Sequence, residues 1–200
     1  MLNICKPIEY KIILLGDSQV GKSAIFSRLS GKKFIEETTS TVGISKVIIN
    51  FQNVEISEKE VINRNFKITL FDTAGQERIR AITKAYFKAS QGIVLIYSID
   101  NEKTFQHLQL WLESIKDSLS DWKRSGYIVM LLGNKSDIAE EDMKKREDLY
   151  EEAQRLWLEQ GIYWGGECNA KAFDEEQLKE TFLKLIKQVF LKLKDDEEDN

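Results

Sequence analysis

The stretch Ile12–Ser23, which reads I-I-L-L-G-D-S-Q-V-G-K-S, decides the fold of this chain. Its leading apolar residues predict a buried strand, and the pattern G-x-x-x-x-G-K-S follows directly over Gly16–Ser23. This spacing is typical of a phosphate-binding loop at the start of a helix, because glycines let backbone N–H groups approach a phosphate group closely. The amphipathic run Ala24–Leu29 continues the helix, whose free N-terminal N–H groups favour an anion. An accidental glycine-rich turn is the alternative, and the strand and helix on either side argue against it.

Two side chains of this loop have a chemical role. Lys22 would reach the β- and γ-phosphates of a nucleoside triphosphate. The hydroxyl of Ser23 would ligate Mg²⁺. The stretch therefore predicts a site for a nucleotide together with Mg²⁺.

Composition excludes several classes of function. The 200 residues suffice for one domain with a sizeable core, and the net charge of −4 argues against nucleic acid, whose backbone requires a basic surface. With only Cys5, Cys168 and His107 available, neither a disulfide framework nor a Cys/His metal site is supported, which fits a reducing cytosol. No apolar run approaches the ~20 residues that cross a bilayer. Met1–Pro7 predicts neither a signal peptide nor N-myristoylation.

Strands and helices are expected to alternate along the chain. Apolar or alternating runs predict strands at Tyr10–Leu15, Ile44–Val54, Asn65–Phe71, Gly92–Ile99, Tyr127–Leu132 and Ile162–Glu167. Helical spacing predicts helices at Lys22–Leu29, Leu108–Trp122, Leu149–Trp157 and Leu178–Leu193. This order specifies an α/β fold, in which a mostly parallel sheet is covered on both faces. We expect one domain over residues 8–194 and an acidic disordered tail over 195–200.

A second set of candidate residues follows the strand Asn65–Phe71. Asp72 lies at the C-terminal end of that strand, where ligands of open α/β sheets bind. It would hold the Mg²⁺ shell through a water, because Mg²⁺ keeps part of its hydration. Gly75 would offer a backbone N–H to a γ-phosphate, and Gln76 would orient the attacking water.

The choice of base is predicted by Asn134-Lys135-Ser136-Asp137, which ends another strand. The carboxylate of Asp137 can accept from both N1–H and the exocyclic amine of guanine. Adenine would leave that carboxylate unpaired, a mismatch that discriminates strongly. The motif is weak alone, but after the phosphate loop and Asp72 it indicates a guanine nucleotide.

In these motifs, their order and their spacing, the chain from Tyr10 to Leu193 resembles the Ras-like small GTPases and, within them, the Rab proteins that direct membrane traffic. Thr41-Val42-Gly43 resembles the first switch of that family, and Asp72–Glu77 resembles the second. Glu167–Lys171 is similar to its last guanine motif. The Rab assignment rests on Asp72–Ile82, Tyr86-Phe87, Leu95–Ile99 and Trp111-Leu112.

The resemblance implies a P-loop NTPase G domain, with a six-stranded sheet in which one strand is antiparallel. It implies that Phe34 packs edge-on to the guanine, that Ala170 lends its N–H to the guanine carbonyl and that Lys171 packs along the base. The catalytic residues implied are Gln76, Lys22 and Thr41, and the implied Mg²⁺ ligands are Ser23, Thr41 and Asp72. The implied nucleotide-binding set is Gly16, Asp17, Ser18, Gln19, Val20, Gly21, Lys22, Ser23, Ala24, Phe34, Thr41, Asp72, Gly75, Asn134, Lys135, Asp137, Asn169, Ala170 and Lys171.

The chain departs from the Rab pattern at several positions. Ser45 and Lys46 stand where Rabs usually have an acidic residue followed by phenylalanine. Lys46 therefore interrupts an aromatic cluster whose other members would be Phe71 and Tyr86. Asn169 replaces the usual serine, which would alter how the base loop is held.

Two further departures concern the surface and the C-terminus. The connection Glu55–Arg64 is longer than in typical Rabs; we expect a surface loop, with a partner-binding insertion as the alternative. Rabs dwell on membranes through prenylated C-terminal cysteines, and the tail of this sequence has none. Either a part of the natural tail is missing from the sequence, or the protein works in solution or through a membrane-bound partner.

We therefore expect a slow GTPase that switches between GTP and GDP, with Mg²⁺ bound. The expected partners are an exchange factor, a GTPase-activating protein and effectors of the GTP form, but no nucleic acid, and the membrane only peripherally. We expect a cytoplasmic monomer, which could also work at the cytosolic face of endomembranes. Two alternatives stay open: a scaffold locked on its nucleotide, and an ATP-using P-loop enzyme such as a small kinase.

Overall fold

The structure is a computed structural model that describes residues 6–33, 43–56, 63–73, 86–119, 127–137, 143–172 and 175–198. For 143, 145 and 195–198 it describes the backbone alone. The strands are β1 (Ile8–Leu15), β2 (Ile44–Glu55), β3 (Asn63–Thr73), β4 (Gly92–Ser98), β5 (Ile128–Asn134) and β6 (Tyr163–Glu167). The described helices are α1 (Lys22–Leu29), α3 (Glu102–Gln106), α4 (Leu108–Ser118), α5 (Met143–Gln160) and α6 (Glu175–Glu198).

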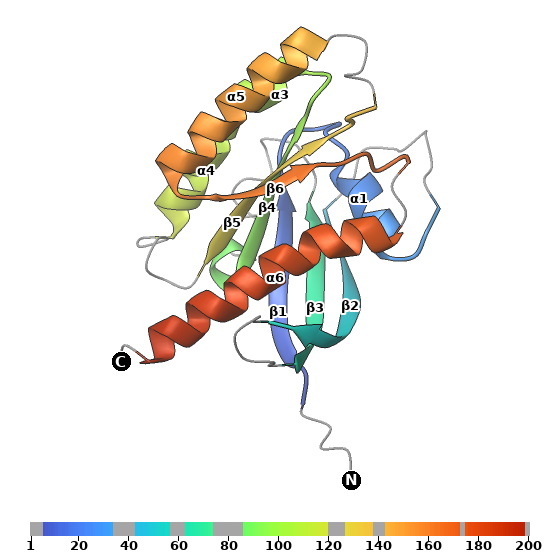
Figure 1. Cartoon of the computed structure of the whole chain (residues 1–200), viewed down its shortest axis with the longest axis vertical. Coiled ribbons are helices and arrows are strands. Elements are labelled where there is room, and N and C mark those ends of the chain that lie inside the picture. Colours follow the sequence, from blue (N-terminus) through green and yellow to red (C-terminus); the bar gives the residue numbers. More distant parts are fainter. Residues whose placement is uncertain are drawn as a thin grey trace.

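The strands form one six-stranded sheet in the order β2-β3-β1-β4-β5-β6. Only β2 runs antiparallel to its neighbour β3, and the other described pairs are parallel. Figure 1 shows β1, β3 and β2 side by side, and the strand order makes β2 and β6 the two edge strands. The predicted α/β fold, with a mostly parallel sheet and one antiparallel strand, is confirmed.

The two faces of the sheet bury alternate residues of the same strands. In β1, Ile12 and Leu14 point to the face covered by α1 and α6, whereas Ile13 and Leu15 point to the face covered by α3, α4 and α5. This alternation follows from the two-residue period of a strand. Figure 1 shows α6 crossing the first of these faces. The sheet therefore lies between two helical layers. Because β1, β3, β4, β5 and β6 run parallel, their C-terminal ends lie at the same edge of the sheet.

The helices differ from their predicted bounds mainly at their ends. The short helix α3 was not predicted, since five residues are too few to show a helical period. Helix α4 ends at Ser118, earlier than the predicted Trp122, because Leu119 leaves the helical region with φ −118° and ψ 89°. Helix α6 ends at Glu198, so its backbone stays helical where the sequence predicts the start of the acidic tail.

The connection between β2 and β3 is shorter than predicted. The antiparallel ladder continues to the pair Glu55 and Asn63, so the loop spans 56–62 instead of Glu55–Arg64. The ladder also shifts register between Phe51 and Val54, next to Asn53 in the left-handed region at φ 53°. The side-chain oxygen of Asn65 accepts the Asn53 N–H at 2.9 Å. This bulge lets the strands pair further, because the extra residue takes up the mismatch. Residues 57–62 lie outside the described residues, and any partner-binding role stays a prediction.

The last strand carries a bulge of its own. Leu131 pairs with Trp164, and Gly133 pairs with Glu167, so Gly165 and Gly166 together oppose one residue of β5. Gly166 has φ +95°. The predicted strand is confirmed, and its two glycines are explained by the bulge.

None of the helices in the described ranges combines the length and the apolar character that a membrane span needs.

Candidate functional site

The phosphate loop joins the end of β1 to the start of α1, as predicted. A Cβ on Gly16 would come within 2.1 Å of the backbone oxygen of Ile96, and one on Gly21 within 2.1 Å of Asn134 Nδ2. Both glycines also have φ in the left-handed range, at +138° and +95°. Packing and backbone conformation thus both require glycine at these two positions.

Lys22 is buried behind the loop, with its side chain folded onto the loop backbone. Its Nζ donates to the carbonyl oxygen of Gly16 at 3.1 Å and to that of Asp17 at 2.6 Å. Burial lowers the pKa of Lys22 to about 8, although the charges of Asp72 and Asp17 favour the protonated form. A poorly hydrated ammonium group held at this position is suited to an anionic ligand.

Asp72 and Ser23 meet at the edge of the loop. The hydroxyl of Ser23 donates to Asp72 Oδ2 at 2.6 Å. Asp72 is 2% exposed, and its Oδ1 is the one buried side-chain oxygen that lacks a hydrogen-bond partner among the residues described. Burial raises the pKa of Asp72, while the Ser23 hydrogen bond and the Lys22 charge oppose that shift. A buried carboxylate oxygen without a partner, next to a hydroxyl, fits the oxygen ligands that Mg²⁺ prefers.

Asn134 connects the phosphate loop to the predicted base loop. Its Nδ2 donates to the carbonyl oxygen of Val20 at 2.8 Å. Its Oδ1 accepts the backbone N–H of Ala170 at 3.2 Å and the thiol of Cys168 at 3.4 Å. One buried side chain thus fixes the spacing between two loops that are far apart in sequence.

Asn169 organises the base loop from within. Its Oδ1 accepts the backbone N–H groups of Lys171 at 2.9 Å and of Ala172 at 3.1 Å. These bonds are of the kind that Asn makes in tight turns. The departure from the Rab pattern at this position therefore keeps a side-chain acceptor for the loop backbone.

Two further residues predicted to contact the base lie after β5. Lys135 has φ 65°, and its Nζ is 3.3 Å from Asp100 Oδ2. Asp137 is partly exposed two residues further on. In the phosphate loop, Ser18 and Gln19 are exposed, and Gln19 also has φ 65°.

The structure therefore brings most of the predicted site residues to one edge of the sheet. These are Gly16, Asp17, Ser18, Gln19, Val20, Gly21, Lys22, Ser23, Ala24, Asp72, Asn134, Lys135, Asp137, Asn169, Ala170 and Lys171. The predicted residues Phe34, Thr41, Gly75 and Gln76 lie outside the described residues. Their roles stay predictions.

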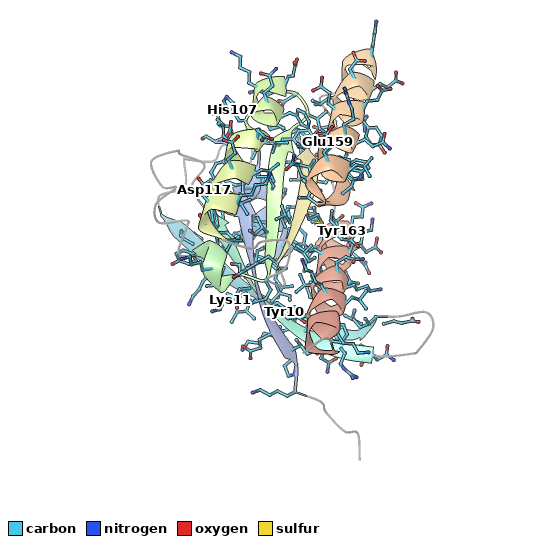
Figure 2. All side chains as sticks on the ribbon, turned by 90° about the vertical axis from the view of Figure 1, so that its left-hand side faces the viewer. Tyr10, Lys11, His107, Asp117, Glu159 and Tyr163 are labelled. Carbon is cyan, nitrogen blue, oxygen red and sulfur yellow. The ribbon has the colours of Figure 1, made fainter. Side chains whose placement is uncertain are left out.

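Sequence reasoning missed the side chains that hold Asp17. Trp111 of α4 donates its indole N–H to Asp17 Oδ1 at 2.9 Å, and His107 Nδ1 lies 2.6 Å from Asp17 Oδ2. Trp111 is buried, whereas the His107 side chain is 52% exposed. Figure 2 labels His107 near the start of α4. No local sequence motif predicts these contacts, because His107 and Trp111 are separated from Asp17 by 90 and 94 residues.

Comparison with known proteins agrees with this geometry. The family model described as "Ras family" matches residues 11–191. Ras-related protein Rab-13 of Mesocricetus auratus is 37% identical over 183 residues, which cover 92% of this chain and 81% of that protein. Ras-related protein Rab-8B of Bos taurus is 34% identical, with 92% and 80% covered. Ras-related protein Rab11D of Nicotiana tabacum is 31% identical, with 90% and 73% covered.

A phosphate loop, a buried carboxylate beside it and a base loop tied to the phosphate loop through Asn134 thus occur in a chain that matches the family model over nearly its whole length. The chain belongs to the Ras family and is a Rab-related small GTPase, an enzyme that hydrolyses GTP.

Proposed function

We propose that this protein is a GTP/GDP switch that hydrolyses GTP slowly and regulates vesicle or membrane traffic. The observation that supports the switch is the Asn134 side chain, which bonds both Val20 and Ala170 and so would hold a phosphate site and a base site at a fixed distance. The traffic role is supported only by the Rab names of the relatives.

Different residues of this chain would bind the phosphates and the base of the nucleotide. Lys22 would exchange its bonds to the loop carbonyls for bonds to the β- and γ-phosphates. Asp137 would accept from guanine, and Ala170 would donate to the guanine carbonyl. Each contact would be made by a group that is already positioned, which lowers the ordering cost of binding.

Ser23, Thr41 and Asp72 would hold Mg²⁺. The ion, when bound, neutralises negative charge on the phosphates. The Oδ1 atom of Asp72 supports this assignment, because a buried carboxylate oxygen without a partner is costly unless a ligand satisfies it.

Hydrolysis would depend on Gln76, which orients the attacking water, with Thr41 and Lys22 at the γ-phosphate. Residues 32–41 and 74–81 would be ordered while the γ-phosphate is present and released after its loss. By analogy with Ras, we expect an intrinsic rate of roughly 10⁻⁴–10⁻³ s⁻¹, raised about 10⁵-fold by an activating protein. The partners would be that protein, an exchange factor and effectors of the GTP form. We propose a monomer in the cytoplasm, which could also act at the cytosolic face of endomembranes.

Single-turnover hydrolysis of bound GTP tests the proposal. GTP should be lost over tens of minutes to hours. The Gln76→Leu variant should bind GTP with unchanged affinity but hydrolyse it at least tenfold more slowly. If wild-type protein keeps its GTP for many hours, even with an activating protein, the chain is a nucleotide-locked scaffold. Unchanged turnover in Gln76→Leu would remove Gln76 from the mechanism.

Competition between GTP and ATP tests the role of Asp137. Guanine nucleotide should be preferred by several orders of magnitude, because adenine leaves the carboxylate unpaired. The Asp137→Asn variant should lose most of that preference. Equal affinity of the wild-type protein for ATP and GTP would contradict the assignment and favour an ATP-using enzyme.

A further inference from the structure

A pocket of about 630 Å³, lined by none of the predicted nucleotide-binding residues, lies between α5 and the edge strand β6. Arg146, Glu147, Tyr150 and Glu151 line it from α5, and Trp164 and Glu167 line it from β6. In the described sheet β6 pairs only with β5, so this side of the molecule ends at the pocket. Figure 2 labels Glu159 on α5 and Tyr163 at the start of β6, the two elements that enclose it.

Two aromatic rings, those of Tyr150 and Trp164, line this pocket, and the ring of Trp157 contacts both. The rings of Tyr150 and Trp164 lie 5.8 Å apart and nearly perpendicular, at 79°. Trp157 stacks on Trp164 at 4.9 Å and 18°, and it also meets Tyr150 edge-on at 6.2 Å. Each ring contacts the other two, so the three rings form one aromatic corner. Tyr150 remains 41% exposed, so this aromatic corner is open to solvent.

The charge of the pocket favours a cation. Arg146 donates to Glu167 from Nε at 3.0 Å and from Nη2, so this pair is neutral overall. Glu147 and Glu151, one turn apart on α5, add two carboxylates. Neither has an ion-pair partner among the described residues. A cation near an aromatic face gains from the ring quadrupole, and here two carboxylates add to that attraction.

We propose that this pocket binds an arginine side chain presented by a protein partner. A guanidinium group is planar, stacks on Trp and Tyr faces, and pairs with carboxylates through two parallel hydrogen bonds. Arg146 and Glu167 already show a guanidinium held by a carboxylate at this place. An anion would be repelled by Glu147 and Glu151, and an apolar side chain would gain nothing from them. The site needs no nucleotide turnover, so it is independent of the proposed function.

Titration of the GDP-loaded, ¹⁵N-labelled full chain with an acetylated, amidated (Gly-Arg)₄ peptide tests the proposal. The indole N–H signals of Trp157 and Trp164 should shift and saturate, whereas that of Trp111 should not. A (Gly-Lys)₄ peptide should bind at least threefold more weakly, because an ammonium group lacks the planar fork. A peptide with citrulline in place of arginine should not bind. Equal binding of the arginine and lysine peptides would overturn the assignment to arginine.

Two double variants distinguish binding of the peptide in the pocket from general attraction between its charge and the charge of the protein. Glu147→Gln with Glu151→Gln should weaken the arginine peptide about fivefold. Asp148→Asn with Glu152→Gln removes the same charge from exposed positions that do not line the pocket, and it should change binding less than twofold. Tyr150→Ala, at an exposed ring, should also weaken binding about fivefold.

Several outcomes would overturn the proposal. If the two double variants weaken binding of the arginine peptide equally, the binding is nonspecific charge attraction. Indole shifts that depend on protein concentration without peptide would assign the pocket to a second copy of this chain. If the indole signals of Trp157 and Trp164 stay unmoved by saturating peptide while the protein remains folded, the pocket binds no arginine.

Discussion

Lys22 and Asp72 are charged side chains that burial pushes toward their neutral forms, the first with a pKa lowered to about 8 and the second with a raised pKa. For Asp72 in the ligand-free protein, the stability it contributes is present below its ordinary pKa and is lost as pH rises through the raised value. Lys22 acts in the opposite sense, because the unfolded chain binds its proton more tightly. Stability therefore rises with pH between about 8 and 10.5. In both groups the cost of burying a charge outweighs the attraction of the neighbouring opposite charges, which is the condition of a site prepared for a ligand.

Trp111 gives a prediction at the scale of one residue. Trp111→Phe keeps a ring in α4 but removes the donor to Asp17 Oδ1. We expect the free energy of unfolding to fall by about 1.5 kcal/mol, because a partly buried carboxylate loses a charge-assisted hydrogen bond. GDP release should also become faster, since the main chain at Asp17 accepts from Lys22. Urea denaturation and release of a fluorescent GDP analogue measure the two effects.

The control for Trp111→Phe is the Asp17→Asn background, where the ring loses the charged acceptor. There the same substitution should cost clearly less. An equal cost in both backgrounds would show that packing of the indole, and not its N–H, stabilises the loop.

At the scale of the element, β6 shows how a strand accommodates one extra residue. Gly165 lies against the core, where an added Cβ would come within 2.9 Å of Met130 and 3.0 Å of the Leu131 backbone oxygen. Gly166 has open space around it, and its φ of +95° is the constraint. The first glycine is thus required by packing and the second by backbone conformation. The bulge places Trp164 and Glu167 at the pocket and delivers Cys168 to Asn134.

Gly166→Ala tests the bulge. We expect the free energy of unfolding of the GDP-loaded protein to fall by about 1–2 kcal/mol, because a Cβ is strained at positive φ. Gly166→Asn should lose less, since Asn tolerates this conformation better. Urea denaturation with an unchanged m-value measures the effect. A loss from Asn equal to that from Ala would indicate that backbone conformation is not the cause.

At the scale of the whole molecule, stability is coupled to the ligands. Phosphate loop, Asp72 and base loop come from β1, β3, β5 and β6, so a bound nucleotide links elements across the sheet. A ligand that binds only the folded protein adds about 2.7 kcal/mol at 100 times its Kd. For a chain of this size that corresponds to a rise in Tm of roughly 5–10 °C.

Removal of Mg²⁺ from the GDP-loaded protein should therefore lower Tm by several degrees and speed GDP release. Asp72→Asn should reproduce both effects in the presence of Mg²⁺ and make the protein insensitive to a chelator. Thermal unfolding at saturating GDP, with and without chelator, provides the measurement. If the chelator shifts Tm equally in wild type and Asp72→Asn, Asp72 does not hold the ion.

The sequence by itself determined the α/β fold, the positions of the six strands and the loop Gly16–Ser23, because each depends on local patterns: alternation, helical spacing and glycines before a helix. It also determined the family, through motifs whose order survives sequence divergence. Only the tertiary structure decided that Trp111 and His107 hold Asp17 and that α5 and β6 enclose an acidic aromatic pocket. These contacts join side chains far apart in the chain, and their geometry depends on how helices settle on the sheet. The bulge of β6 belongs to the same class, since its extra residue shows only when the strand is paired with β5.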